Sequence, residues 1–284
     1  MTSASVSRES VSAPRNRSLR TRFDAVVAAE FRRQPLQPPG PLIASVDLEH
    51  LPDPVRRYVE RSGVLGRPRP QNMRVVMDAS MFRKPGQAPM RARSIQYSFF
   101  GRPTRVFLME ARMLGLPVRA LHVYRCEEAT FTVRVASAIT MVDLSGPQIS
   151  AAETVTVLND LCLMAPGALL DPRLRWTGID NGMAQVTMVN GPHEVTALLA
   201  FNDDAELVDF SSDDRPDASG GQFVPMRWST PVTDYLDVDG MHQLRRGGAV
   251  YDRPEGPFLY GDFTVRSIEY DLAGPHDPRE SHSA

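Results

Sequence analysis

The chain has 284 residues, of which 42% are hydrophobic and 23% charged, proportions typical of a globular protein with a sizeable core. Its formal net charge of −2 excludes the broad basic surface of a nucleic-acid-binding protein, so we expect no nucleic-acid partner. Two cysteines far apart in sequence, with no C-x-x-C pair, argue against a disulfide scaffold and against a zinc or redox motif.

The N-terminus is rich in Ser and Arg and has no apolar segment of the secretory kind. No window of the chain approaches the ~20 apolar residues of a membrane-spanning helix. We therefore expect a soluble, cytoplasmic protein without a transmembrane segment. Residues 1–22 and 274–284 contain few apolar side chains, which predicts disordered tails.

Two short helices are predicted before residue 65. Residues 23–34 have apolar side chains at helical spacing, and the Pro-rich linker that follows extends to residue 45. In the second helix, Asp53 suits the N-cap, Pro54 the first helical position and Gly63 the C-terminal cap.

From Gln71 the apolar period changes to two, which indicates β-strands. The strands are separated by Gly, Pro, Asn and Asp residues, which form the turns of a meandering antiparallel sheet. In the last strand the apolar face changes phase, which predicts a β-bulge near Arg266–Ser267. Twelve strands are predicted, near 71–81, 90–100, 104–113, 117–126, 130–139, 174–179, 184–190, 193–201, 206–212, 222–236, 241–252 and 259–271.

One helix, residues 150–164, interrupts the strands. Ser150 and Glu153 have the spacing of a capping box, and Pro166 and Gly167 end the helix. A flat sheet of about 11–12 strands would be unusually wide, so we expect it to curl. The predicted fold is mainly β (α+β): one domain, residues 46–273, with a strongly curved antiparallel sheet or open β-barrel and helices on its concave face.

Between Leu51 and about Leu272 the chain resembles a family of bacterial proteins catalogued only as a domain of unknown function. The segments that carry the resemblance are LPDPVRRYVERSGVLG, ETVTVLNDLCLMAPGALLDPRLRW, SDDR, STPVTDY and IEYD. More distantly, the order of curved sheet, inserted helix and long closing strands is similar to periplasmic lipoprotein carriers, which hold an acyl chain in an open β-barrel.

Two polar clusters are candidate functional residues. Asn159 and Asp160 lie in the middle of the predicted helix, where they either face solvent or tie the helix to the sheet and line a cavity. Asp213, Asp214 and Arg215 follow a strand; they form a surface ion pair, or a proton-transfer site in which one carboxylate has a raised pKa and Arg215 binds an anion. Asp160, Asp213, Asp214 and Arg215 are the candidate catalytic residues.

Aromatic residues on predicted strands complete the candidate ligand-binding set, which is Asn159, Asp160, Asp214, Arg215, Trp176, Trp228 and Tyr235. The common metal and cofactor motifs do not occur, and we expect neither a metal nor a cofactor.

Three functions are compatible with these features. The first is a non-enzymatic protein that binds a hydrophobic small molecule or acyl chain in the cavity of the curved sheet. The second is an enzyme, such as a cyclase, isomerase or hydrolase, that uses carboxylate acid–base chemistry in the same cavity. The third is a protein-interaction module.

Overall fold

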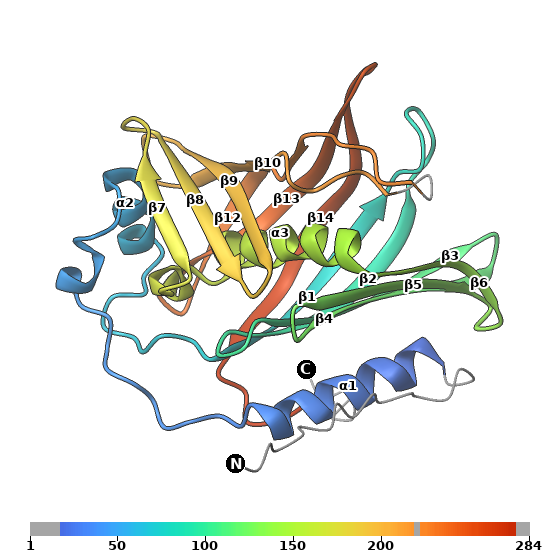
Figure 1. Cartoon of the computed structure of the whole chain (residues 1–284), viewed down its shortest axis with the longest axis horizontal. Helices are drawn as coiled ribbons and strands as arrows, with labels where there is room; N and C mark the ends of the chain where they lie inside the picture. The colour runs from blue at the N-terminus through green and yellow to red at the C-terminus, as the bar shows by residue number, and fades with distance from the viewer. Residues whose placement is uncertain (1–17, 219–221, 277–284) are drawn as a thin grey trace, which may run out of the picture.

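The structure is a computed structural model that describes residues 18–218 and 222–276. Most of the first predicted tail and the last eight residues of the second lie outside the described residues. Fourteen strands form one antiparallel sheet that curls into a half-barrel (Figure 1). The predicted curved antiparallel sheet is thus confirmed. The strand order is β6-β5-β4-β3-β2-β1-β14-β13-β11-β10-β9-β8-β7, and β12 pairs with β13.

The strands are β1 Asn72–Met81, β2 Met90–Phe99, β3 Thr104–Met113, β4 Leu116–Arg125, β5 Glu128–Val135, β6 Ile139–Ser145, β7 Leu174–Gly178, β8 Met183–Asn190, β9 His193–Phe201, β10 Leu207–Ser212, β11 Trp228–Ser229, β12 Val232–Val238, β13 Met241–Arg253 and β14 Gly256–Tyr270.

The sheet contains two more strands than the pattern predicts. β6 is mostly exposed, so no buried face marks it in the sequence. The predicted strand near 222–236 is instead a loop followed by two separate strands, β11 and β12. Pro231 lies between these two strands, and a proline has no N–H to continue a ladder of hydrogen bonds.

The β-bulge predicted near Arg266–Ser267 is confirmed. Val76 of β1 pairs with Ser267 and Met77 pairs with Val265, so Arg266 is the extra residue on β14. The bulge keeps Phe263, Val265, Ile268 and Tyr270 on the same side of β14, in spite of the change of phase in the sequence.

The alternation of strand direction brings four hairpin turns to one end of the sheet. These turns are residues 82–89, 114–115, 136–138 and 254–255, and we call this end the hairpin end. At the opposite end, the β4–β5 turn meets the β8–β9 hairpin. There Asn190 Nδ2 donates to Tyr124 Oη at 2.7 Å, and His193 Nε2 lies 2.9 Å from the Glu127 carbonyl oxygen. We call this end the closed end, since these contacts join the two arms of the half-barrel.

Helix α3, Pro147–Met164, lies in the hollow of the sheet (Figure 1). It begins three residues before the predicted start, and its N-cap is Gly146, whose φ of 105° is accessible to glycine. The predicted capping box is therefore wrong. Ser150 Oγ instead donates to the Gly146 carbonyl and accepts from the Ala129 N–H of β5, which fixes the start of the helix to the sheet.

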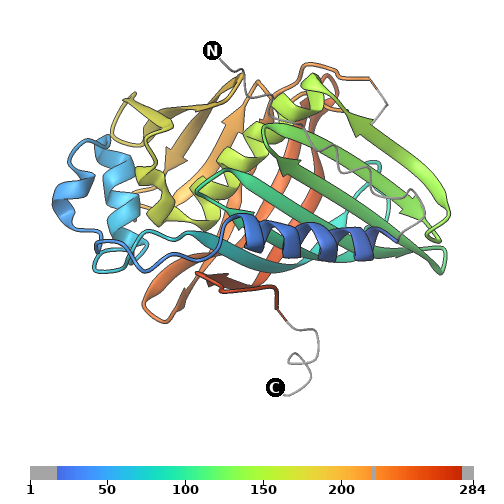
Figure 2. The ribbon, with the colours of Figure 1, turned by 60° about the horizontal axis from the view of Figure 1, so that its bottom comes forward.

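Helix α1, Leu19–Arg33, packs on the outer face of the sheet (Figure 2). It begins four residues before the predicted start, because Leu19 is buried with Phe23, Val27 and Phe31. These side chains pack against apolar residues of β2, β3 and β4 that point away from α3. Strand β3, apolar on both faces in the sequence, is thus covered on both sides.

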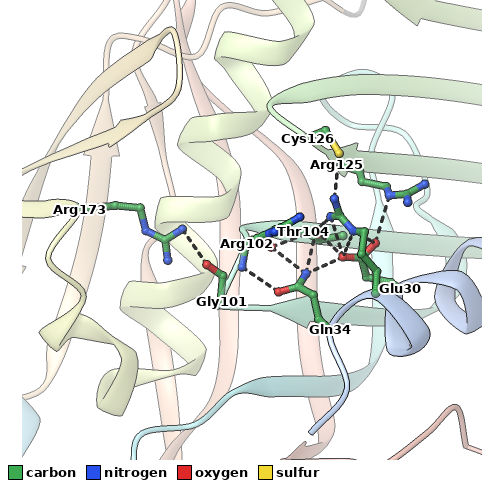
Figure 3. A network of polar contacts seen from close by, with 9 residues as sticks. Glu30, Gln34, Gly101, Arg102, Thr104, Arg125, Cys126 and Arg173 are labelled. Atoms are coloured by element: carbon green, nitrogen blue, oxygen red, sulfur yellow. Dashed lines mark hydrogen bonds and ion pairs between the residues drawn. The ribbon is translucent and has the colours of Figure 1, made fainter. Parts of the chain in front are cut away.

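A polar network fastens the C-terminal end of α1 to the sheet (Figure 3). Glu30 is fully buried and forms ion pairs with Arg33 at 2.7 Å and Arg125 at 3.1 Å. Thr104 Oγ1 lies 3.2 Å from the same carboxylate. Arg33 also donates to the sulfur of Cys126, an exposed residue of the β4–β5 turn, at 2.9 Å.

Helix α2, Asp53–Arg61, follows the 3₁₀ turn Ser45–Leu48. Its N-cap is Pro52 rather than Asp53. Gly63 ends the helix as predicted, with φ of 79°. A side chain at this position would clash, since a Cβ on Gly63 would lie 2.1 Å from the carbonyl oxygen of Gly240 in the β12–β13 turn.

Candidate functional site

Five ionisable side chains meet between α3 and the concave face of the sheet. Glu153 and Asp160 are on the same face of α3, two turns apart. Strands β3 and β4 and the loop after β10 supply the others. We call Arg105, His122, Glu153, Asp160 and Arg215 the ion cluster.

Arg105 and Glu153 connect the members of the ion cluster. Arg105 Nε lies 2.7 Å from Asp160 Oδ2, and Arg105 Nη1 lies 3.5 Å from Glu153 Oε2. Glu153 also lies 3.4 Å from His122 Nδ1 and 3.6 Å from Arg215 Nη2. With a neutral imidazole, the two guanidinium groups balance the two carboxylates, which is a condition for burying charge.

Arg215 also binds uncharged neighbours. Its Nε donates to Thr156 Oγ1 of α3 at 3.0 Å, and its Nη1 donates to the Tyr251 hydroxyl. The guanidinium lies 4.4 Å from the ring centroid of Trp228, a cation–π contact. The Trp228 indole in turn donates to the Tyr260 hydroxyl at 2.9 Å.

The cluster is deeply buried, since Glu153 is 2% and Asp160 7% exposed. Burial alone would raise the pKa of Glu153, but His122, Arg215 and Arg105 lower it to about 2. For Asp160, burial outweighs the attraction of Arg105 and raises the pKa. Burial also lowers the pKa of His122, so we treat the imidazole as neutral at pH 7. The two carboxylates of α3 therefore differ in proton affinity.

Two buried polar atoms of β2 have no hydrogen-bond partner among the described residues. They are Ser94 Oγ and Gln96 Oε1. The other end of the Gln96 side chain donates to Asp160 Oδ2 at 2.7 Å. Ser94 and Gln96 are 1% and 0% exposed, and buried polar atoms without partners are costly in a folded protein. These atoms could take hydrogen bonds from a bound polar group.

Partly exposed apolar side chains adjoin the same core. We call Met81, Phe223, Met226, Tyr260 and Phe263 the apolar strip. Met81, Tyr260 and Phe263 belong to β1 and β14, and Phe223 and Met226 to the loop before β11. Gly261 leaves room for the Phe263 ring, because a Cβ at this position would lie 2.6 Å from a ring carbon. The concave side therefore presents an apolar surface next to buried charges.

The structure brings together some of the sequence-predicted site residues and separates others. Asp160 and Arg215 belong to the ion cluster, and Trp228 stacks on Arg215. Asn159 is buried and donates to Thr230 Oγ1 at 2.6 Å, so it ties α3 to the loop after β11 and does not face solvent.

Asp213 and Asp214 lie outside the ion cluster. Asp213 is exposed and forms an ion pair with Arg227 at 2.9 Å, which lowers its pKa. Asp214, also exposed, accepts from the Thr196 N–H at 2.7 Å. Of the two alternatives for Asp213 and Asp214, the surface ion pair fits the structure better than the proton-transfer site, because both side chains are exposed after β10.

Trp176 and Tyr235 also make other contacts. Trp176 lies on the edge strand β7 and packs against the main core. Tyr235 donates to the Leu207 carbonyl at 2.7 Å and stacks on His242, with ring centroids 4.8 Å apart. Neither residue belongs to the ion cluster.

Four residues of the site were not predicted from the sequence: Arg105, His122, Glu153 and Gln96. Arg105, His122 and Gln96 alternate with apolar residues on strands, a pattern that also describes a solvent-facing side. Glu153 was assigned to a helix cap. The helical spacing of Glu153, Thr156 and Asp160 is a sequence signal that could have placed these residues on one face.

Comparisons with known proteins were made by sequence and by fold. A search of curated protein sequences finds no relative of this chain. An outer membrane lipoprotein-sorting protein domain from Vibrio parahaemolyticus has a similar structure, with 6% identity, a TM-score of 0.43 and coverage of 74% of this chain and 89% of that chain.

Two further solved structures are similar. A DUF1329 family protein from Desulfovibrio piger has 14% identity and a TM-score of 0.42, over 82% of this chain and 99% of that chain. A LolA superfamily protein from Nitrosomonas europaea has 10% identity and a TM-score of 0.39, over 81% of this chain and 97% of that chain.

The expectation of a cytoplasmic location is corrected by these neighbours. The Vibrio parahaemolyticus domain is named for sorting lipoproteins of an outer membrane, a task outside the cytoplasm. Within residues 18–218 and 222–276, none of the helices combines the length and apolar character needed to cross a membrane.

The family comparison covers most of the chain, including α2, α3 and the whole ion cluster. The model of a family of unknown function (DUF6544) matches residues 41–263. The match contains the segments around Asp53, Asn159 and Arg215 that carry the resemblance in the sequence. Helix α1 lies before its start. The chain belongs to the DUF6544 family.

Proposed function

We propose that this protein binds a hydrophobic small molecule or acyl chain on the concave side of its sheet, with the polar end of the ligand at the ion cluster. The observation that carries the proposal is the position of buried charges next to the apolar strip. An amphipathic ligand has the complementary arrangement, with a polar group at one end and hydrocarbon along the rest.

The unpartnered atoms support the polar half of the site. Gln96 Oε1 is buried beside Asp160, and Ser94 Oγ is buried two residues earlier on the same strand, both without hydrogen bonds among the described residues. A ligand hydroxyl, amide or protonated carboxyl group would satisfy them, which removes a desolvation penalty of ~1–3 kcal/mol for each atom.

The apolar strip supports the hydrocarbon half. A separate pocket of about 150 Å³, lined by Val64, Pro166 and Tyr270 among others, is smaller than the ~300–1,000 Å³ of typical ligand sites. The ligand chain is therefore expected along the apolar strip instead. Methionine and phenylalanine side chains in the strip adapt readily to the shape of a chain.

The test starts with native mass spectrometry of the purified protein and solvent extraction of any bound compound. Cis-parinaric acid, a fluorescent fatty acid, then serves as a probe of binding. We expect Met81→Arg and Phe263→Arg to weaken probe binding at least about tenfold, since each places a charge in the strip. The matched control is Val46→Arg, at a position 66% exposed on the 3₁₀ turn before α2.

Two results would overturn this proposal. One is an unliganded mass together with no saturable binding of the probe. The other is equal probe affinity in the strip variants and the Val46→Arg control, with all variants folded by circular dichroism.

A second candidate function, acid–base catalysis, is favoured by the His122–Glu153 pair. A neutral imidazole 3.4 Å from an ionised carboxylate can accept a proton while the carboxylate orients the ring. Arg215 would then stabilise developing negative charge. Turnover of the extracted compound, lost in His122→Phe while its binding persists, would distinguish the enzyme from the binding protein.

A further inference from the structure

The outer face of the sheet has a groove of about 980 Å³ that reaches the hairpin end. It runs over β1–β4, β13 and β14, on the side away from α3. Six arginines and three carboxylates line it, a formal excess of three positive charges in a chain whose net charge is −2. Positive charge is thus concentrated at one place on an otherwise slightly acidic molecule.

Half of these arginines form no ion pair with a carboxylate in the part of the chain that the structure describes. Arg91 donates to Ser80 Oγ at 2.8 Å, and Arg112 donates to the Gly115 carbonyl at 3.2 Å. Arg93 is exposed and forms no hydrogen bond or ion pair with another described residue. Three guanidinium groups are therefore available to bind an external anion.

Apolar side chains project from the same end of the sheet. The exposed fractions are 98% for Leu114, 50% for Leu116, 58% for Ile139 and 61% for Met141. All four belong to the β3–β4 and β5–β6 hairpins, which lie side by side at the hairpin end (Figure 1). We call them the apolar tips.

Folding does not explain a leucine at position 114. The two-residue turn gives Leu114 a φ of 50° and Gly115 a φ of 81°. This left-handed conformation favours Asn, Asp or Gly and is unfavourable for leucine. The side chain also buries almost no area, so it contributes no packing. Its exposure at the end of the groove indicates a contact outside the chain.

We propose that the hairpin end docks on the surface of a membrane that contains anionic lipids, with the arginines of the groove at the head groups and the apolar tips in the interface. A membrane offers binding partners for both features. Lipid phosphate groups bind the guanidinium groups, and the boundary of the hydrocarbon layer accepts leucine, isoleucine and methionine side chains. A soluble acidic polymer would engage the groove but would leave the tips in water.

This docking is independent of ligand binding on the concave side. It uses the outer face and the tips, whereas the ion cluster and the apolar strip lie on the other face. Each proposal can therefore fail without the other.

The experiment is co-sedimentation of the full chain with vesicles of phosphatidylcholine, with and without added phosphatidylglycerol. We expect binding to the anionic vesicles that weakens with salt. Leu114→Asn should reduce it at least about fivefold, because asparagine suits the turn and removes the apolar tip. Arg91→Gln with Arg93→Gln should have a similar effect, since each charge near the surface contributes roughly 1 kcal/mol.

Matched controls are Leu236→Asn, 47% exposed on β12, and Arg175→Gln, an exposed residue of β7 paired with Glu194. Both should bind vesicles as the unchanged chain does. The proposal is overturned if the chain binds neither kind of vesicle, or if the groove and tip variants bind as tightly as the controls. Binding of soluble polyphosphate with an affinity that Leu114→Asn leaves unchanged, in the absence of vesicle binding, would assign the groove to an acidic polymer instead.

Discussion

Glu153 is the residue on which the ion cluster depends, because His122, Arg105 and Arg215 all face its carboxylate. Its pKa is lowered from 4.5 to about 2, so the ionised form is bound more favourably in the folded chain than in the unfolded one. Asp160, two helical turns further on, has a raised pKa, and its ionised form is not favoured in the same way.

This difference predicts unequal effects of two substitutions. Glu153→Gln should lower the free energy of unfolding at pH 7, since the folded chain favours the ionised carboxylate that the substitution removes. The ionised Glu153 contributes fully to stability above about pH 4.5, and this contribution is lost as the pH falls toward 2. The free energies of unfolding of the variant and the parent chain should therefore converge toward pH 2. Urea unfolding followed by tryptophan fluorescence measures both effects.

Asp160→Asn is the matched control, with a carboxylate replaced on the same helix face. Asp160→Asn should lower the free energy of unfolding less than Glu153→Gln does at pH 7, because the folded chain does not favour the charge that this substitution removes. A larger loss of stability in Asp160→Asn than in Glu153→Gln would contradict this ranking.

At the same scale, the sequence predicted only part of the site. Asn159 and Asp160 stand out as polar residues within an apolar helix, and Arg215 as part of a local charge cluster. Arg105 and His122 could not be found in this way, because a polar residue on a strand faces either the core or the solvent according to the register. Only the pairing of β3 with β4 places both residues on the concave face.

At the scale of elements, the sequence pattern predicts strands and turns well, but it predicts contacts between distant elements poorly. The alternation of apolar and polar residues identified most strands, and the change of phase of this alternation in β14 located the bulge at Arg266. The face covered by α1 did not follow from its own residues, because an amphipathic helix fits either side of a sheet. The buried carboxylate of Glu30 and its arginine partners set its position on the outer face.

Replacing Phe23 and Phe31 by alanine is expected to release helix α1 from the sheet while the sheet stays folded. The ring centroids of Phe31 lie 5.0 Å from Phe99 and 5.8 Å from Tyr97, and Phe23 also contacts Tyr97. Replacing Phe23 and Phe31 by alanine removes ~3–5 kcal/mol of packing at each position. A 15-residue helix without packing is only marginally stable, so α1 should unfold.

Trypsin digestion with mass spectrometry measures this release, since α1 contains several arginines. Cleavage within α1 should become at least about tenfold faster in the double variant, while the sheet remains resistant. Ala25→Ser, at an exposed position of the helix, should leave the cleavage rate unchanged. Equal rates in the two variants would show that the phenylalanines do not hold the helix.

At the scale of the whole molecule, the half-barrel is open at one end and joined at the other. The edge strands β6 and β7 do not pair with each other, and side-chain contacts at the closed end hold the two arms together. The Tyr124 hydroxyl is central to these contacts, since it bonds Asn190 of β8 at 2.7 Å and Thr154 of α3 at 3.0 Å.

Tyr124→Phe should therefore lower the free energy of unfolding by about 2 kcal/mol, because Asn190 Nδ2 loses its acceptor and Thr154 Oγ1 keeps only its bond to the Ser150 carbonyl. A double-mutant cycle with Asn190→Ala isolates the contact between the arms, and we expect a coupling energy of about 1 kcal/mol. Additive effects of the two substitutions would mean that the arms are held together by other contacts.

The two cysteines differ in a way that makes the intact chain convenient to label. Cys162 is buried within α3, and burial raises the pKa of its thiol, whereas Cys126 is exposed at the closed end. A maleimide dye should therefore attach at Cys126 alone, without any substitution. Strand β4 has 10 residues, so the dye would sit ~30 Å from the Leu116 end of the strand. Energy transfer to an acceptor in a bilayer would then report which end of the molecule faces the lipid.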